Sequence, residues 1–94
     1  MNAGRSRWKI ILDVLRSVKG SKVVKKTHIM MKANLDSKNF EKYLVFLLEY
    51  GFIAGEEQET GYQLTEKGRE LLQRLNEVDV FLGKKLSSRE DPGI

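Results

Sequence analysis

The chain has 94 residues, of which 40% are hydrophobic and 32% are charged, and its formal net charge is +4. This length supports one domain with one modest core. The absence of cysteine excludes a disulfide framework and a thiolate metal site. The apolar runs are far too short for a membrane span and no apolar signal segment begins the chain, so we expect a cytoplasmic protein.

Charge is distributed unevenly between the two halves of the sequence. Residues 1–50 carry eleven Lys and Arg against four Asp and Glu, whereas residues 51–94 carry six against nine. A basic half joined to an acidic half favours one surface that faces a polyanion and a separate surface for solvent or oligomerisation. Ordinary scatter of charged residues is the alternative.

The first predicted helix begins after Ser6, whose side chain can cap it, and runs to about Val18. Residues 1–5 have nothing to bury, and we expect them to be disordered. A cation followed by glycine, Lys19 and Gly20, suits the end of this helix. One of its faces is apolar: Trp8, Ile11, Leu12, Leu15 and Val18.

The next stretch predicts a helix, a tight turn and a second helix, which together form a helix-turn-helix. Val23 and Val24 precede it and could form a short strand. Thr27 opens or lies within the shorter helix, whose buried side is predicted to hold Ile29, Met30 and Ala33.

The longer, central helix follows a turn at Asn34 and Leu35. It begins at Asp36 or Ser37, because a short side-chain oxygen there satisfies free backbone N–H groups, and Gly51 ends it. Apolar residues recur along it at steps of three and four: Phe40, Leu44, Leu47 and Leu48.

Strand-forming residues at 52–54 and 62–64 flank a polar loop with glycine at both ends, which predicts a β-hairpin. Thr65 then caps a final helix. The predicted fold class is therefore α+β, a winged helix-turn-helix of three helices and a hairpin wing over residues 6–65. A long C-terminal dimerisation helix follows over residues 66–86, and residues 87–94 form a tail.

The C-terminal helix is predicted to be about 30 Å long at 1.5 Å per residue, which exceeds what the rest of the domain can cover. We expect its second half to pair with the same helix of a second copy as an antiparallel homodimer. The expected interface residues are Leu75, Val78, Phe81, Leu82 and Leu86. The alternative is that this stripe folds back on the Trp8 helix within one monomer.

The sequence offers no constellation for catalysis or for metal binding. His28 is the only histidine, and a lone histidine on a short polar helix is more often a surface residue than a base or ligand. Glu56, Glu57 and Glu59 lack calcium-loop spacing and are better explained as a solvated turn. We therefore expect no enzyme activity, no cofactor and no small-molecule substrate.

Basic and amide side chains cluster around the central helix, which favours double-stranded DNA as the partner. Lysine contacts guanine edges or phosphates, asparagine pairs with adenine, and a helix N-terminus favours a phosphate. The candidate major-groove contacts are Ser37, Lys38, Asn39 and Lys42. The candidate contacts to the DNA backbone are Lys22, Lys25, Lys26, Thr27 and Lys32.

Two features favour a different function, a protein-interaction module. The wing tip over residues 56–59 is acidic, whereas a wing that lies along phosphates should be basic. Tyr43, Phe46 and Tyr50 form an aromatic strip on the side of the central helix, which we expect to pack under the first or last helix rather than to stack on bases. In this alternative the acidic wing and the aromatic strip dock a protein partner.

The segment YQLTEKGRELL, from Tyr62 to Leu72, resembles the wing-to-helix junction of winged-helix regulators of the MarR and PadR type. Together with THIMMKANLD and KYLVFLLEYGFI, it resembles small archaeal winged-helix DNA-binding proteins that dimerise through a long C-terminal antiparallel coiled coil. The resemblance covers about residues 7–86. It implies a homodimer that binds duplex DNA on the nucleoid, as a transcriptional regulator or as a chromatin-type protein.

Overall fold

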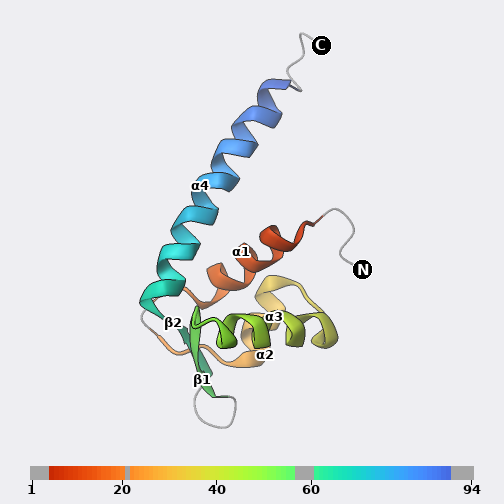
Figure 1. The fold of residues 1–94 in the computed structure, drawn as a ribbon. Coiled ribbons are helices and arrows are strands. Elements are labelled where there is room, and N and C mark those ends of the chain that lie inside the picture. The colour runs from red at the N-terminus through yellow and green to blue at the C-terminus, as the bar shows by residue number, and fades with distance from the viewer. Residues whose placement is uncertain (1–4, 21, 57–60, 90–94) are drawn as a thin grey trace.

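Four helices and one β-hairpin make up the part of the chain that the structure, a computed structural model, describes: residues 5–20, 22–56 and 61–89. Figure 1 shows the three shorter helices and the hairpin gathered into one body, from which the last helix projects. In chain order the elements are α1 Arg7–Val18, α2 Lys26–Ala33, α3 Ser37–Glu49, β1 Ile53–Glu56, β2 Gly61–Leu64 and α4 Glu66–Arg89.

Helix α1 lies at the centre of the core and is buried on more than the one predicted side. The Ser6 hydroxyl caps it by accepting a hydrogen bond from the Lys9 backbone N–H at 3.4 Å, as predicted. Because α2 and α4 both pack against α1, Ile10 and Val14 are buried as well as the predicted stripe. Trp8 and Ile11, which we expected in that stripe, are only partly buried against the core.

Helices α2 and α3 form the predicted helix-turn-helix. Asn34 makes the turn with a φ of 57°, a left-handed conformation that asparagine tolerates better than most residues. Each helix turns one apolar face to the core, as predicted, and Leu35 is buried between them. Of the residues predicted on these faces, Met30 and Leu48 are only partly buried. The buried residues on these faces are Ile29, Ala33, Phe40, Leu44 and Leu47.

The hairpin pairs β1 and β2 as antiparallel strands, from Ile53 opposite Leu64 to Glu56 opposite Gly61. The strand predicted at Val23 and Val24 is reduced to a single bridge, in which the Val24 backbone N–H donates to the Tyr62 carbonyl at 2.7 Å. Gly61 adopts a φ of 120°, and a Cβ there would collide with the Val24 carbonyl oxygen. Of the acidic tip predicted at residues 56–59, only the backbone of Glu56 is described, and residues 57–60 lie outside the described residues.

The junction between the hairpin and α4 is held by Thr65, as predicted. Its hydroxyl accepts a hydrogen bond from the Gly68 backbone N–H at 2.9 Å and donates one to the Gly51 carbonyl at 2.6 Å. Helix α4 continues to Arg89, three residues further than predicted, so the start of the expected tail at residues 87–89 is helical. The reason is local, because residues 84–89 contain neither proline nor glycine.

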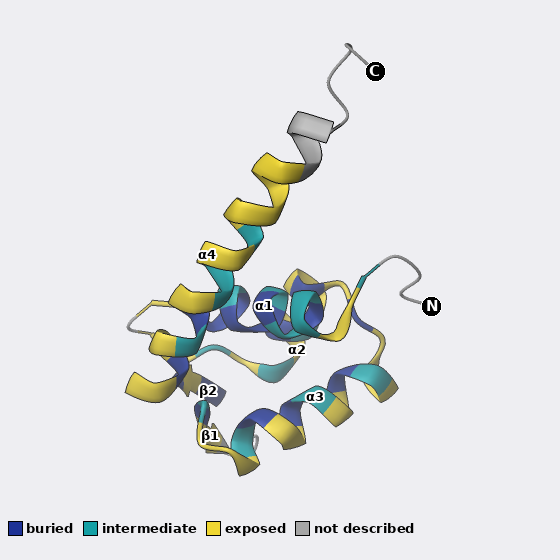
Figure 2. Cartoon of the chain, turned by 45° about the horizontal axis from the view of Figure 1, so that its top comes forward, coloured by how far each residue is buried: buried dark blue, intermediate teal, exposed yellow. Residues whose placement is uncertain are grey.

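The distal half of α4 extends beyond the body of the protein, as Figure 2 shows by its exposed surface. Val78, Phe81 and Leu82 are 44%, 59% and 40% exposed, so the stripe does not fold back on α1 and that alternative is wrong. Leu75 instead packs partly against the protein's own core. The side chain of Leu86 lies outside the described residues. No helix in the described ranges is long and apolar enough to span a membrane.

Candidate nucleic-acid interface

The N-terminus of α3 is fixed by a local hydrogen-bond network around Asp36. The Asp36 carboxylate accepts hydrogen bonds from the Asn39 backbone N–H at 2.8 Å and from the Asn39 side-chain amide at 3.0 Å. These bonds lower the pKa of Asp36 below its ordinary value of 3.8, the backbone bond contributing most. The cap therefore places a negative charge where the free helix terminus would otherwise favour a phosphate.

The exposed face of α3 carries the predicted lysines at its N-terminal end. Ser37, Lys38 and Lys42 are exposed, and Asn39 is half-buried with one amide proton directed to Asp36. Within the described residues, neither Lys38 nor Lys42 has a hydrogen-bond or ion-pair partner. Both ammonium groups are therefore available to an anion outside the chain.

The C-terminal end of the same exposed face is apolar and acidic. Val45 and Tyr50 are 52% and 55% exposed, and Glu49 is exposed beside them. The exposed face of α3 is thus divided along its length, and only its N-terminal half has the charge to approach a polyanion.

The predicted flanking residues are not all brought together. Lys22, Lys25 and Thr27 are exposed before and within the start of α2. The Lys26 ammonium is ion-paired with Glu41 of α3 at 2.9 Å and is mostly covered. Lys32 lies instead beside Asp13 and Arg16 of α1, where these side chains line a hollow of about 280 Å³.

The expected packing of the aromatic strip is correct only for Tyr43, which packs partly against the core. Phe46 is 37% exposed, and Tyr50, one turn further along α3, lies beside it with the ring centroids 4.9 Å apart. The expectation of packing under α1 or α4 is wrong for Tyr50, whose side chain is largely exposed, whereas Phe46 lines a hollow together with Arg7 and Ile11 of α1. The remaining aromatic neighbour of Phe46 is Phe52, at 6.3 Å.

A family model described as winged helix-turn-helix matches residues 4–82, which is most of the chain. The chain belongs to the winged helix-turn-helix family. This membership and the element order confirm the predicted fold class, in which the hairpin is the wing and α4 the long C-terminal helix.

Two relatives of this chain come from the archaeon Methanocaldococcus jannaschii. The uncharacterized protein MJ0287 is 37% identical over 81 residues, which cover 86% of this chain and 80% of that protein. The uncharacterized protein MJ0290 is 43% identical over 74 residues, which cover 79% of this chain but only 34% of that protein. The chain thus spans about a third of the second relative.

A solved structure with the same winged-helix fold is the crystal structure of Sso10a-2, described as a DNA-binding protein from Sulfolobus solfataricus. The TM-score is 0.79 at 24% sequence identity, and the match covers 92% of this chain and 90% of that chain. The similarity extends along almost all of both chains, so it shows a shared fold that includes the long last helix.

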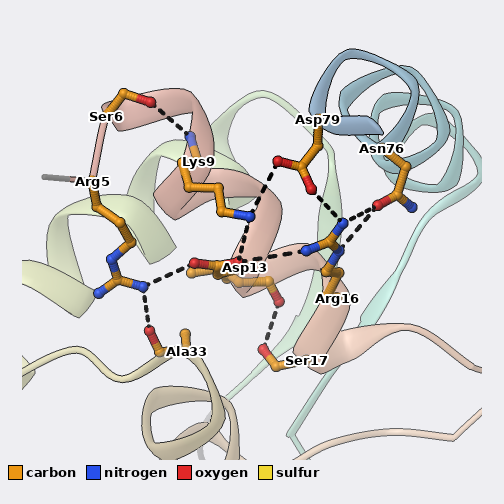
Figure 3. Close-up of polar contacts among 10 residues, drawn as sticks. Arg5, Ser6, Lys9, Asp13, Arg16, Ser17, Ala33, Asn76 and Asp79 are labelled. Carbon is orange, nitrogen blue, oxygen red and sulfur yellow. Dashed lines mark hydrogen bonds and ion pairs between the residues drawn. The ribbon is translucent and has the colours of Figure 1, made fainter. Parts of the chain in front are cut away.

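Arg5, which precedes α1, holds the helix-turn-helix in place, although we predicted that residues 1–5 are disordered. Its guanidinium donates hydrogen bonds to the carbonyls of Ala33 at 2.7 Å and Asn34 at 2.8 Å. It also pairs with the Asp13 carboxylate at 3.0 Å, as Figure 3 shows. Arg5 therefore ties the end of α2 to α1, and the remaining residues of that segment, 1–4, lie outside the described residues.

A second polar network joins α1 to α4 (Figure 3). The Arg16 guanidinium donates to the Asn76 side chain at 2.6 and 3.0 Å and to the Asp79 carboxylate at 3.1 Å. Lys9 also binds Asp79, at 3.3 Å. Partial burial raises the pKa of Asp79, but the bonds from Arg16 and Lys9 outweigh it, so the pKa lies below 3.8. This network sets how α4 leaves the body.

Sequence reasoning missed Arg7 as a candidate binding residue. It is exposed at the start of α1 and lines the same hollow as Lys42 of α3. The only available signal was that Arg7 falls outside the apolar stripe of its helix, and that signal does not say which other element lies beside it.

The described residues contain no group of three or more His, Cys, Asp or Glu side chains that could hold a metal ion. A larger hollow, of about 700 Å³, lies between the end of α1 and α4, and none of its lining residues belongs to α3. Its walls include Leu64, Leu72 and Val80, and no nucleophile and base face each other across it.

Proposed function

We propose that this winged-helix protein binds double-stranded DNA by inserting the N-terminal half of α3 into the major groove. The observation that carries the proposal is the exposure of Lys38 and Lys42 without partners among the described residues. Exposed lysines on one face of a recognition helix supply contacts to phosphates and to guanine edges. That Sso10a-2 is described as a DNA-binding protein supports the same function.

The contacts to the DNA backbone are drawn from both sides of α3. Lys22, Lys25 and Thr27 are exposed on the approach to α2 and supply phosphate contacts. Lys26 contributes less, because Glu41 already neutralises it. Ser37 and Asn39 lie at the start of α3, where Asn39 can offer a base its remaining amide groups.

We further propose that the protein is a homodimer joined through α4. The exposed stripe of Val78, Phe81 and Leu82 is apolar, and a second copy of α4 would remove it from water. Leu86 would continue the stripe. Leu75 would contact both the dimer interface and the core of its own chain. The domain division follows, with residues 6–65 as the DNA-binding body and the distal part of α4 as the dimerisation element.

The role that follows is that of a transcriptional regulator or a chromatin-associated protein on the nucleoid. Phosphate contacts dominate the candidate interface, which favours affinity with modest sequence preference. Mapping bound sites across the genome separates the two roles. A few sharp sites indicate a regulator, whereas broad coverage indicates an architectural protein.

The experiment that tests DNA binding compares two double variants with the same charge change. Lys38→Ala with Lys42→Ala removes the proposed contacts, and Lys84→Ala with Lys85→Ala removes two exposed lysines from distal α4. Affinity for a random duplex is measured by fluorescence anisotropy over a range of salt concentrations. Each lost phosphate contact lowers the salt slope by about 0.9, so the first variant should lose about 1–2 in slope.

The second variant should retain the slope of the unchanged protein. Equal losses in both variants would show that net charge, and not the α3 face, sets the affinity. A salt-independent affinity of the unchanged protein would refute phosphate contacts altogether.

A protein-interaction module is the second candidate function. It is favoured by the exposed apolar end of α3, where Val45, Phe46 and Tyr50 are 52%, 37% and 55% exposed. Apolar patches rimmed by charged residues mark docking surfaces for other proteins. Failure to bind any duplex at low salt would favour this function over DNA binding.

A further inference from the structure

A hollow of about 340 Å³ lies between α1 and α3, at the edge of the proposed DNA-binding face. Five side chains line it: Arg7, Ile11, Lys42, Tyr43 and Phe46. Two of them are cationic, two are aromatic and one is aliphatic. Lys42 belongs both to the proposed DNA-binding face of α3 and to this hollow, so a DNA strand that contacts one is also within reach of the other.

The two cations of the hollow come from different helices and are both available to a ligand. Arg7 begins α1, and Lys42 lies in the middle of α3. Both are exposed, and among the described residues neither makes a hydrogen bond or an ion pair. Two unpaired cations that line one hollow attract an anion, and the phosphates of a DNA strand are such anions.

The Phe46 ring, which lines the hollow, is held in place by neighbouring aromatic rings. The Phe46 ring stays 37% exposed, while Tyr50 at 4.9 Å and Phe52 at 6.3 Å support it. Phe52 is itself covered by the Lys67 ammonium at 4.9 Å from its ring centroid. A supported ring loses little conformational freedom when a planar ligand stacks on it.

We propose that this hollow receives one unpaired base of DNA, stacked against Phe46 and Tyr43, while the flanking phosphates bind Arg7 and Lys42. Alternation of aromatic rings with cations is how proteins hold single-stranded nucleic acid, because every base has a face that can stack. The inference rests on the proposed function, since Lys42 serves both. It adds a preference for duplexes with an unpaired base, at a bulge, gap or strand end.

The test compares a blunt duplex with the same duplex carrying two unpaired thymines. Dissociation constants are measured by fluorescence anisotropy at one salt concentration, and the readout is their ratio. We expect the unpaired thymines to tighten binding of the unchanged protein by about tenfold, the contribution of one stacked base. Phe46→Leu should abolish that preference and leave blunt-duplex binding unchanged, whereas Phe46→Trp should retain the preference.

The matched control is Val45→Ala, which removes exposed apolar atoms from the same helix without touching the lining of the hollow or the rings that contact Phe46. It should keep the preference. Loss of preference in this control, or its retention in Phe46→Leu, would overturn the proposal. Binding of both duplexes with equal affinity would also overturn it while leaving the proposed function intact. Failure to bind either duplex would refute the proposed function itself.

A second measurement does not depend on folded variants. A 5-iodouracil base at the unpaired position is irradiated in complex with the unchanged protein, and the crosslinked residue is identified by mass spectrometry. A crosslink to Phe46 or Tyr43 supports the proposal. A crosslink confined to other residues contradicts it.

Discussion

Replacing Arg5 with methionine should destabilise the protein far more than its place near the chain end would indicate. The guanidinium makes hydrogen bonds to two backbone carbonyls and an ion pair with Asp13, and its side chain is only 20% exposed. Methionine preserves the apolar length of the side chain but removes every one of these donors.

The size of the effect follows from those contacts. A hydrogen bond that involves a charged group contributes about 1.5–3 kcal/mol, but the three contacts share one partly exposed guanidinium and do not add fully. We therefore expect a loss of about 2 kcal/mol in the free energy of unfolding. For a domain of this size, such a loss lowers the melting temperature by about 8–16 °C.

Thermal unfolding followed by circular dichroism measures this change, at a fixed protein concentration because dimerisation would add to the apparent stability. Arg74→Met is the matched control, since Arg74 pairs with Glu70 at 3.0 Å in a setting where both side chains are mostly exposed. It should cost less than about 0.5 kcal/mol. Arg5→Lys keeps the charge without the guanidinium fork and should recover only part of the loss. Equal shifts for Arg5→Met and Arg74→Met would refute the bracing role of Arg5.

Two further predictions concern assembly and acid stability. Leu82→Lys should leave the fold intact and yield monomers in sedimentation velocity. Val80 is 55% exposed on the other side of α4, so Val80→Lys should leave the dimer intact. Identical sedimentation of the two variants would contradict the proposed dimer interface. The lowered pKa values of Asp36 and Asp79 mean that both carboxylates stabilise the fold above about pH 4, and this stability is lost as the pH falls through their folded-state pKa values. The free energy of unfolding, measured with denaturant between pH 7 and pH 2.5, should therefore fall at the acid end. This fall should be smaller when both residues are changed to asparagine. An equal fall in the double variant would assign the acid sensitivity to other groups.

Much of the fold could be predicted because its signals are local. The Ser6 and Thr65 caps and the end of α3 before Gly51 each depend on neighbouring residues alone. Helical periodicity likewise identified the buried face of α3, because that helix has a single apolar side.

The features that escaped prediction depend on contacts between distant segments. The burial of Ile10 and Val14 requires knowing that α1 lies between two helices. Arg5 carries no local sign of binding the end of α2, which is 28 residues away. The same limitation applies to the candidate site, where Lys38 and Lys42 followed from the pattern of α3 but the proximity of Arg7 did not.

Helix α4 runs without interruption from the hairpin to Arg89, so it acts as a lever whose pivot is the Arg16–Asp79 contact with α1. The ten residues of α4 beyond Asp79 span about 15 Å at 1.5 Å per residue. A rotation of 10° about this pivot would therefore displace the tip by about 3 Å. In a dimer joined at the tips, the separation of the two α3 helices would depend on the stiffness of a few polar contacts near the pivot.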